Sequence, residues 1–348
     1  MKVGVLGAGA YGLALTHILV NNKVEVTMWT HDENERKTLD ETRKSKKLND
    51  YKIPNEIKFT CDLNEAVNDK DLIVMAIPAF AFEDVTIKLS KYIKKKQPVL
   101  IATKGIQQNT CLFLNDVFAK YLKNGIAVIS GPTFAVDIIK DSPVGFSLAT
   151  KNNKTEMVVR KCFQNSTTKD IVGIEICGSI KNVMAIASGM LEGMGVTDST
   201  RALFLTESMN DIKELIDALG GKKKSILSFA GFGDILMTCT SKNSRNFSFG
   251  YLIGSGATNE EVNIVIKDKL NIIIPGVKFS ILYTSFGILN CLNIYNRNNG
   301  KIIEKIILSG SLIISLKFLL ANVSILIIIL LYYFYKSIFK VFSFSFFY

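Results

Sequence analysis

The sequence predicts an α/β protein, with a doubly wound sheet at the N-terminus, an all-α domain after it and an atypical apolar tail. Three observations support this prediction. A strand, a glycine-rich turn and a helix open the chain, and apolar strands then alternate with helical stretches as far as residue 150. Beyond residue 174 the apolar residues follow a helical spacing. The predicted domains are residues 1–175, 176–261 and 262–348.

The glycine turn GAGAYG at residues 7–12 lies between an apolar strand and an apolar helix. Gly7 permits a tight turn, Gly9 lets the backbone approach a pyrophosphate, and Gly12 lets the helix lie close to the sheet. The helix N-terminus offers N–H groups and a positive dipole end to phosphates. Because a second strand follows, the segment predicts a Rossmann-type, dinucleotide-binding unit.

The tip of the second strand bears on the choice between NAD and NADP. Asp32 lies about 20 residues after the glycines, where an acidic side chain usually binds the ribose 2′-hydroxyl of NAD. His31, Arg36 and Lys37 are near enough in sequence to hold the 2′-phosphate of NADP. The sequence leaves both cofactors open, and we lean slightly to NADPH.

Length and charge narrow the class of partner. A chain of 348 residues suggests two domains. Its net charge of +11 is uneven, because nine Lys and Arg face two Asp and Glu from Val262 onward, which leaves +7 in the tail and +4 elsewhere. The nearly balanced main part suits a small anionic ligand better than nucleic acid.

The cysteines and the N-terminus indicate a cytoplasmic protein. The six cysteines form no C-x-x-C pair and have no histidine cluster beside them, so we expect neither a disulfide framework nor a metal site. The first apolar run is broken by glycines, unlike a signal peptide.

Further strands are predicted at residues 71–78, 98–103, 125–130 and 144–150, which are apolar runs. In doubly wound sheets, ligands bind outside the carboxyl ends of the strands. Lys104 directly follows one of these strands. It is therefore either a ligand-binding cation or an ordinary solvated strand end.

The helical region begins with a stretch of small and apolar residues at 178–190, which contains Lys181 and Asn182 among few other polar groups. An apolar environment disfavours the charged form of a lysine and tends to lower its pKa, which suits an acid or base in catalysis. The alternative is a lysine whose ammonium group reaches solvent along the helix surface.

Two later segments carry further polar groups. Asp234 follows a glycine pair and precedes an apolar stretch, which also fits a helix N-cap. Residues 244–246 (SRN) combine a guanidinium group with two neutral hydrogen-bonding side chains, a set suited to phosphate. The alternative for these residues is a surface loop.

Taken together, the motifs resemble those of the bacterial NAD(P)-dependent glycerol-3-phosphate dehydrogenase family. The resemblance runs from residue 1 to about residue 261 and rests on segments in unbroken order: GAGAYG at 7–12, W-x-H-D at 29–32, ATKG at 102–105, ISGPTFA at 129–135, IKNVMAIASGM at 180–190, AGFGD at 230–234 and SRN at 244–246.

The resemblance implies NAD(P)H-dependent, reversible reduction of dihydroxyacetone phosphate to sn-glycerol 3-phosphate, a precursor of glycerophospholipids. It implies that Lys181 donates the proton to the C2 oxygen as hydride arrives from the nicotinamide. The substrate-binding residues implied by matching positions are Lys104, Gly131, Thr133, Asp234, Ser244, Arg245 and Asn246. The implied cofactor-binding residues are Gly7, Gly9, Ala10, Tyr11, Gly12, His31, Lys104, Ala135 and Arg245. Ala10 stands where the family often has Ser, so we expect a backbone N–H to replace one hydroxyl contact with phosphate.

The tail departs from the family pattern. Beyond residue 261 we find no Val-Glu-Gly segment, whose glutamate binds the cofactor in the family. Residues 318–335 are uncharged and mostly apolar, long enough to span a bilayer, and Lys336 and Lys340 follow them as a positive-inside end. An Ile, Asn and Phe-rich tail is also what an out-of-frame reading of an A/T-rich gene would produce, and we favour that interpretation.

Three functions therefore compete. The first is the enzyme just described, acting on a small phosphorylated substrate, without nucleic acid and as a homodimer. The second is a catalytically impaired or membrane-tethered homologue that still binds a dinucleotide. The third is a related reductase with another keto substrate, which the set at residues 244–246 speaks against.

Overall fold

The computed structural model describes residues 1–49, 51–107, 110, 112–163 and 166–257. Contacts between residues divide the chain into two units. The first unit contains residues 1–107, 112–179 and 219–234, and the second contains Thr110, residues 180–218 and the described chain after residue 234. The domain boundary predicted after residue 175 lies four residues before the boundary between the two units, which falls after residue 179. The division of the chain into independent domains stays a prediction.

The first unit is built on a sheet of eight strands among the described residues, in the order β10-β9-β8-β7-β6-β1-β2-β5. A separate two-stranded hairpin joins β3 (Lys44–Ser45) to β4 (Tyr51–Lys52). The strands of the large sheet are β1 (Lys2–Leu6), β2 (Glu25–Trp29), β5 (Lys58–Thr60), β6 (Leu72–Met75), β7 (Val99–Ile101), β8 (Ile126–Ser130), β9 (Ser147–Ala149) and β10 (Ser166–Thr168). The Rossmann-type prediction is confirmed.

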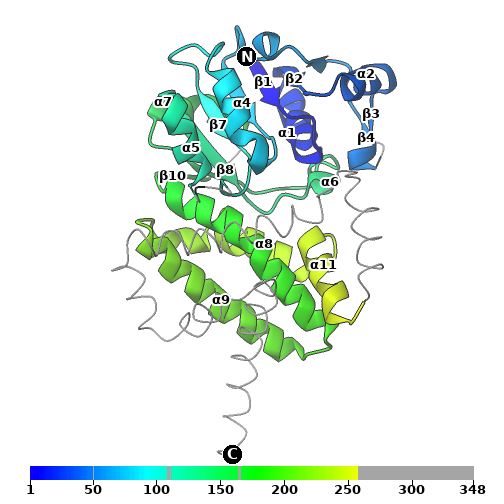
Figure 1. Ribbon diagram of the computed structural model, residues 1–348, viewed down its shortest axis with the longest axis vertical. Coiled ribbons are helices and arrows are strands. Elements are labelled where there is room, and N and C mark those ends of the chain that lie inside the picture. Colours follow the sequence, from blue (N-terminus) through cyan, green and yellow to red (C-terminus); the bar gives the residue numbers. More distant parts are fainter. Residues whose placement is uncertain (50, 108–109, 111, 164–165, 258–348) are drawn as a thin grey trace, which may run out of the picture. The chain divides into compact units, whose positions relative to one another are not determined.

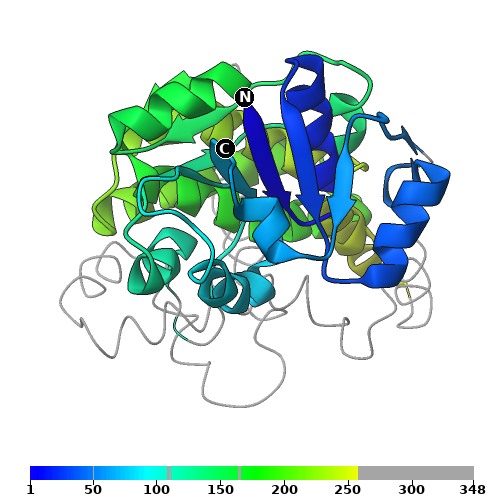
Figure 2. The same cartoon turned by 90° about the horizontal axis from the view of Figure 1, so that it is seen from above.

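Pairing within the sheet is parallel from β5 to β8. Val3 lies opposite Val26 of β2 and Leu72 of β6, and the two blue strands β1 and β2 run side by side in the same direction (Figure 2). β9 differs, because it runs antiparallel to β8, with Val128 opposite Ala149. An antiparallel neighbour needs no crossover helix, and only a four-residue helix separates these strands.

Helices of the first unit separate its strands. They are α1 (Ala10–Asn21), α2 (Glu33–Thr42), α3 (Leu63–Val67), α4 (Phe82–Leu89), α5 (Leu114–Tyr121), α6 (Ala135–Ile138) and α7 (Asn153–Cys162), as labelled in part in Figure 1. Short 3₁₀ turns occur at Lys46–Leu48, Ala79–Ala81 and Lys223–Leu227, and a π-helical turn at Phe229–Gly233.

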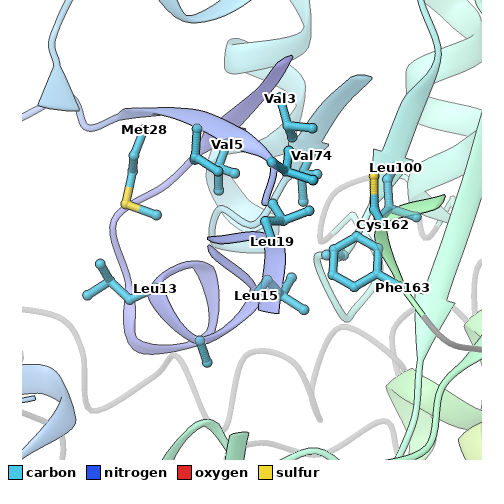
Figure 3. Close-up of a cluster of buried hydrophobic side chains, with 14 of the residues drawn as sticks. Val3, Val5, Leu13, Leu15, Leu19, Met28, Val74, Leu100, Cys162 and Phe163 are labelled. Atoms are coloured by element: carbon cyan, nitrogen blue, oxygen red, sulfur yellow. The ribbon is translucent and has the colours of Figure 1, made fainter. Parts of the chain in front are cut away.

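The core of the first unit lies between α1 and the sheet. Leu15 and Leu19 of α1 are fully buried and gather with Val3, Val74 and Phe163 (Figure 3). Because these strands are buried on both faces, their sequences are continuous apolar runs rather than alternating ones. That is why β1, β6, β7 and β8 could be predicted from sequence.

The chain returns to the first unit at residues 219–234, and one buried carboxylate holds this segment in place. Asp170 is 6% exposed, and its Oδ2 accepts hydrogen bonds from the backbone N–H of Lys222 at 2.8 Å and from Ser225 Oγ at 2.5 Å. Its Oδ1 accepts from the N–H of Gly173, at the start of a long helix. Asp170 thereby joins two segments about fifty residues apart.

The second unit consists of helices in its described part. α8 (Ile171–Gly193) begins in the first unit and continues into the second, followed by α9 (Asp198–Ala218), α10 (Asp234–Thr240) and α11 (Arg245–Gly254). The helical prediction for this region is confirmed.

Glycines let α8 and α11 approach closely. A Cβ at Gly189 would lie 2.0 Å from the carbonyl oxygen of Phe247, and a Cβ at Gly250 would lie 2.0 Å from that of Ile186. Gly193 and Gly254 repeat the arrangement one turn further on, at 2.2 and 2.1 Å from the carbonyl oxygens of Tyr251 and Met190. Backbones therefore meet where side chains would otherwise separate them.

The described residues include one long apolar helix and three buried cysteines. Within the described residues, α8 alone is long and apolar enough to cross a bilayer, and 89% of its apolar stretch is buried inside the protein. The segment predicted at residues 318–335 lies outside the described residues. Cys162, Cys177 and Cys239 are fully buried, and burial raises the pKa of the Cys162 and Cys177 thiols to about 12.

Glu175 of α8 is a fully buried carboxyl group in the first unit. Its Oε1 accepts a hydrogen bond from the backbone N–H of Asn115, in the first turn of α5, at 3.1 Å. Among the described residues, its Oε2 has no hydrogen-bond partner. Burial raises the pKa of Glu175 from 4.5 to about 8, and the nearby charge of Asp116 adds to this shift. The folded protein therefore holds a neutral carboxylic acid at neutral pH.

We expect Glu175→Gln to stabilise the protein increasingly as pH rises from about 5 to 8. In this window the unfolded chain has released a proton that folded Glu175 retains, so wild-type stability falls by up to about 1.4 kcal/mol per pH unit from this group. Glutamine keeps the acceptor for Asn115 and does not titrate. Urea unfolding of both proteins at several pH values checks this. Glu56→Gln, at an exposed position, is the control. A difference between E175Q and wild type that does not change with pH would contradict the assignment.

Candidate active site

The glycine turn is built as its spacing predicts. Gly7 has a φ of +112°, and its N–H donates to the carbonyl of Trp29 at 2.8 Å. A Cβ at Gly12 would lie 2.1 Å from the carbonyl oxygen of Gly7, so only glycine allows α1 to start this close to the end of β1.

Gly9 has a different environment from Gly7 and Gly12. It is the N-cap of α1, where it supplies no side-chain hydrogen bond, and a Cβ there would meet nothing within 4 Å. The first residues of α1, Ala10 and Tyr11, are partly exposed. An uncapped helix start beside open space fits the pyrophosphate of a dinucleotide.

Lys104 follows β7 and joins the other strand ends. Its Nζ lies 3.0 Å from Oδ2 of Asp234 and 3.3 Å from the carbonyl oxygen of Gly131, which follows β8. It also lies 5.4 Å from the centre of the Tyr11 ring. Its side chain is 19% exposed, so this lysine is not a solvated strand end.

Asp234 is fully buried, and its carboxylate is part of an ion pair rather than a helix cap. Its backbone is already helical, as the first residue of α10, so the N-cap alternative is wrong. Ser130 Oγ lies 3.4 Å from the same carboxylate oxygen. Ser130 was absent from the predicted site, although it lies inside the ISGPTFA motif that could have indicated it.

Thr133 and Ala135 extend the strand end after β8. Thr133 is 6% exposed, donates to the carbonyl of Gly131 at 3.1 Å and lies 3.3 Å from the Tyr11 hydroxyl. A Cβ at Gly131 would lie 2.1 Å from the carbonyl oxygen of Gly145. Ala135 is the first residue of α6.

The tip of β2 leaves the choice of cofactor open. His31 is exposed, and Asp32 caps α2 by accepting from the N–H groups of Asn34 and Glu35. Arg36, one of the residues proposed for a 2′-phosphate, forms salt bridges to two acidic side chains, Glu33 at 2.7 Å and Asp40 at 2.6 Å.

The predicted residues of the second unit lie on α8 and at the start of α11. Lys181 is 7% exposed. Its neighbour Asn182 accepts a hydrogen bond through Oδ1 from Nδ2 of Asn246 at 2.8 Å, which joins the two helices. Ser244 is the buried N-cap of α11, accepting from the N–H of Phe247, and Arg245 is exposed in the first turn. Asn182 was noted beside Lys181 but was not in the predicted site.

The structure thus brings the predicted residues together in two groups. Tyr11, Lys104, Gly131, Thr133 and Asp234 are connected in the first unit, and the segment 244–246 is connected to the Lys181 turn in the second. In the described part of the chain, no three His, Cys, Asp or Glu side chains gather as metal ligands. The roles of these residues stay predictions.

A Rossmann-type unit with this glycine turn, joined to a helical unit with a buried lysine, defines an NAD(P)-dependent dehydrogenase. Two family models match, described as the N-terminus and the C-terminus of NAD-dependent glycerol-3-phosphate dehydrogenase, over residues 2–156 and 170–283. The chain belongs to the NAD-dependent glycerol-3-phosphate dehydrogenase family. The second match continues to residue 283, past residue 261, where the sequence resemblance was expected to end.

Individual relatives agree with this assignment. Glycerol-3-phosphate dehydrogenase [NAD(P)+] of Thermoanaerobacter sp. is 37% identical over 266 residues, covering 75% of this chain and 81% of the relative. A second such enzyme, from Lactobacillus delbrueckii subsp. bulgaricus, is 38% identical over 288 residues, covering 79% and 84%. The crystal structure of glycerol-3-phosphate dehydrogenase from Coxiella burnetii has a TM-score of 0.72 at 25% identity, covering 88% of this chain and 98% of that one.

We expect Gly9→Ala and Gly12→Ala to differ in their effects. A methyl group at Gly9 enters open space, so the melting temperature should not change, while the affinity for NADPH should fall at least about tenfold because the methyl group meets the pyrophosphate. A methyl group at Gly12 meets backbone, so stability should fall as well, by about 1–3 kcal/mol. Calorimetric melting and titration with NADPH check both. Wild-type NADPH affinity in G9A would rule out the proposed phosphate site.

Proposed function

We propose that this chain reduces dihydroxyacetone phosphate to sn-glycerol 3-phosphate, reversibly, with Lys181 as the proton donor. The family to which it belongs carries out this reduction, using NAD or NADP. The observation that carries the mechanistic proposal is the burial of Lys181 on α8, in a helix turn that is joined by hydrogen bonding to the segment 244–246.

The chemistry requires a hydride and a proton. NAD(P)H, when bound, supplies the hydride to the carbonyl carbon C2. The alkoxide that forms at the C2 oxygen needs a proton, and the Lys181 ammonium group can donate it.

In the first unit, the glycine turn and the strand ends beside it would bind the dinucleotide. The N-terminus of α1 would hold the pyrophosphate, with Ala10 contributing a backbone N–H, and His31 and Ala135 would contact the dinucleotide. Lys104 would place a positive charge beside the substrate. Asp234 supports this role, because its ion pair balances that charge and holds the ammonium group in one position.

The second unit would hold the substrate phosphate. Ser244, Arg245 and Asn246 lie at the N-terminus of α11, where backbone N–H groups and the helix dipole favour an anion. Arg245 adds a guanidinium group with several donors; the residue keeps exposed surface, while the protein atoms around the guanidinium lower its pKa by desolvation.

We further propose that the protein acts in the cytoplasm, as a homodimer and without nucleic acid. Its similarity to glycerol-3-phosphate dehydrogenases over residues 2–283 supports an enzyme. The alternative is an impaired or membrane-tethered homologue that binds the dinucleotide only. It is favoured by the 65 residues that follow the second match.

The test is NADPH oxidation with dihydroxyacetone phosphate by the full chain and by Lys181→Ala. We expect turnover by the wild type and a loss in kcat of about 10²–10⁴ in the variant, the range for a general acid. NADPH affinity should be retained in both. Lys213→Ala, a partly exposed lysine of α9, is the control and should keep full activity. An active K181A would exclude the proton-donor role, and an inactive wild type that still binds NADPH would support the alternative.

We expect Arg245→Ala to raise KM for dihydroxyacetone phosphate about 10- to 100-fold, because one charge-assisted hydrogen-bonding group to the phosphate is lost. The change in kcat should be smaller. Steady-state kinetics measure both constants. Lys242→Ala removes an exposed cation three residues away and should leave KM near the wild-type value. An unchanged KM in R245A would mean that the phosphate binds elsewhere.

A further inference from the structure

The amino ends of three neighbouring parallel strands bring separate loops together. β6, β7 and β8 are adjacent in the sheet. Asn124, just before β8, donates through Nδ2 to the carbonyls of Lys94 and Gln97 at 2.8 and 2.9 Å. Gln97, just before β7, donates through Nε2 to the carbonyl of Lys70 at 2.9 Å. These side-chain bonds hold the three loops in one surface.

This surface is strongly basic. From Val85 to Gln107 the sequence has no acidic residue. α4 and α5 pack against each other and place their last turns here (Figure 1). We define the basic patch by seven exposed lysines: Lys88, Lys91, Lys94, Lys95, Lys96, Lys120 and Lys123.

The neighbouring carboxylates do not neutralise the patch. Asp69 pairs with Lys2 at 3.5 Å, and Asp71 accepts from the backbone N–H of the same Lys2. Asp84 lies one turn before Lys88 on α4, and Asp116 lies one turn before Lys120 on α5, and neither aspartate forms a salt bridge to these lysines. Across the described residues, the seven lysines of the patch form no salt bridge. Their charges therefore add up, and the patch attracts a negatively charged surface.

Two apolar side chains lie within the basic patch. Ile87, in the last turn of α4, and Tyr92, just after it, are each 40% exposed. Ile87 directly precedes Lys88, and Tyr92 lies between Lys91 and Lys94. An exposed tyrosine and an exposed isoleucine beside lysines are typical of protein surfaces that rest in the headgroup region of a bilayer, where the ring and methyl groups enter the acyl boundary.

We propose that the basic patch docks the protein reversibly onto a bilayer containing anionic lipids. The lysines supply the electrostatic attraction, and Ile87 and Tyr92 supply a small apolar contact. The patch lies at the amino ends of the parallel strands, whereas the glycine turn and Lys104 lie at their carboxyl ends. Docking therefore leaves the dinucleotide site accessible to water. This inference does not depend on the proposed activity.

A bilayer suits the patch better than nucleic acid does. The patch contains no arginine, the side chain that recognises phosphate through paired hydrogen bonds. Lysines act as hydrated point charges, which suit the diffuse charge of a lipid surface. The exposed isoleucine has no role in binding a phosphodiester backbone but does contribute at a bilayer.

The experiment is co-sedimentation of the full chain with vesicles of phosphatidylcholine alone or with 30 mol% phosphatidylglycerol. We expect binding to the anionic vesicles only, and weaker binding in high salt. The triple variant Lys94→Gln, Lys95→Gln, Lys96→Gln should bind about 100-fold more weakly, since each lysine near such a surface contributes a factor of about five. Tyr92→Ser should also weaken binding.

A triple variant with the same net charge provides the control. Lys44→Gln, Lys46→Gln and Lys52→Gln remove three exposed lysines from the β3–β4 hairpin region of the same unit and should bind like the wild type. Both triple variants keep residues 258–348, so any contribution of that segment is equal in the two. Equal binding by both triple variants, binding to neutral vesicles, or patch-dependent binding to a DNA duplex without binding to lipid would each overturn the proposal.

Discussion

The buried ion pair between Asp234 and Lys104 is the interaction on which the first group of site residues depends. It joins a strand end to a segment 130 residues later in the chain. A fully buried carboxylate is costly unless a cation compensates it, so each partner fixes the other. The return segment that delivers Asp234 is itself held by Asp170, whose carboxylate binds Lys222 and Ser225. Two buried carboxylates thus organise a region that the sheet alone does not determine.

Much of this architecture could be predicted from the sequence, for a physical reason. β1, β6, β7 and β8 are buried on both faces, and such strands must be continuous apolar runs. β5 and β10 have three residues each and read KFT and STT, too short and too polar to differ from a loop. The antiparallel direction of β9 is invisible in its own composition, because the direction depends on the path of the preceding connection, which contains only a four-residue helix.

The site shows the same division between local and long-range information. The glycine turn could be predicted because each glycine meets a local backbone constraint. The pairing of Lys104 with Asp234, and the bond between Asn182 and Asn246, join residues far apart in the chain, which spacing does not encode. The family motifs placed Lys104, Asp234 and Asn246 among the predicted site residues, but their contacts, and the contribution of Asn182, came only from the structure. The same holds for the close approach of α8 and α11, where four glycines on two separated segments act together.

The buried cysteines give the molecule internal indicators of its own opening. A thiol with a pKa near 12 and no exposed surface does not react with alkylating reagents until the surrounding packing opens. Cys162 and Cys177 belong to the first unit and Cys239 to the second. The rate at which each thiol becomes labelled therefore measures local unfolding of its own unit, with no engineered probe. The natural sequence thus allows the opening of the nucleotide-binding part and of the lysine-bearing part to be followed separately in a single sample.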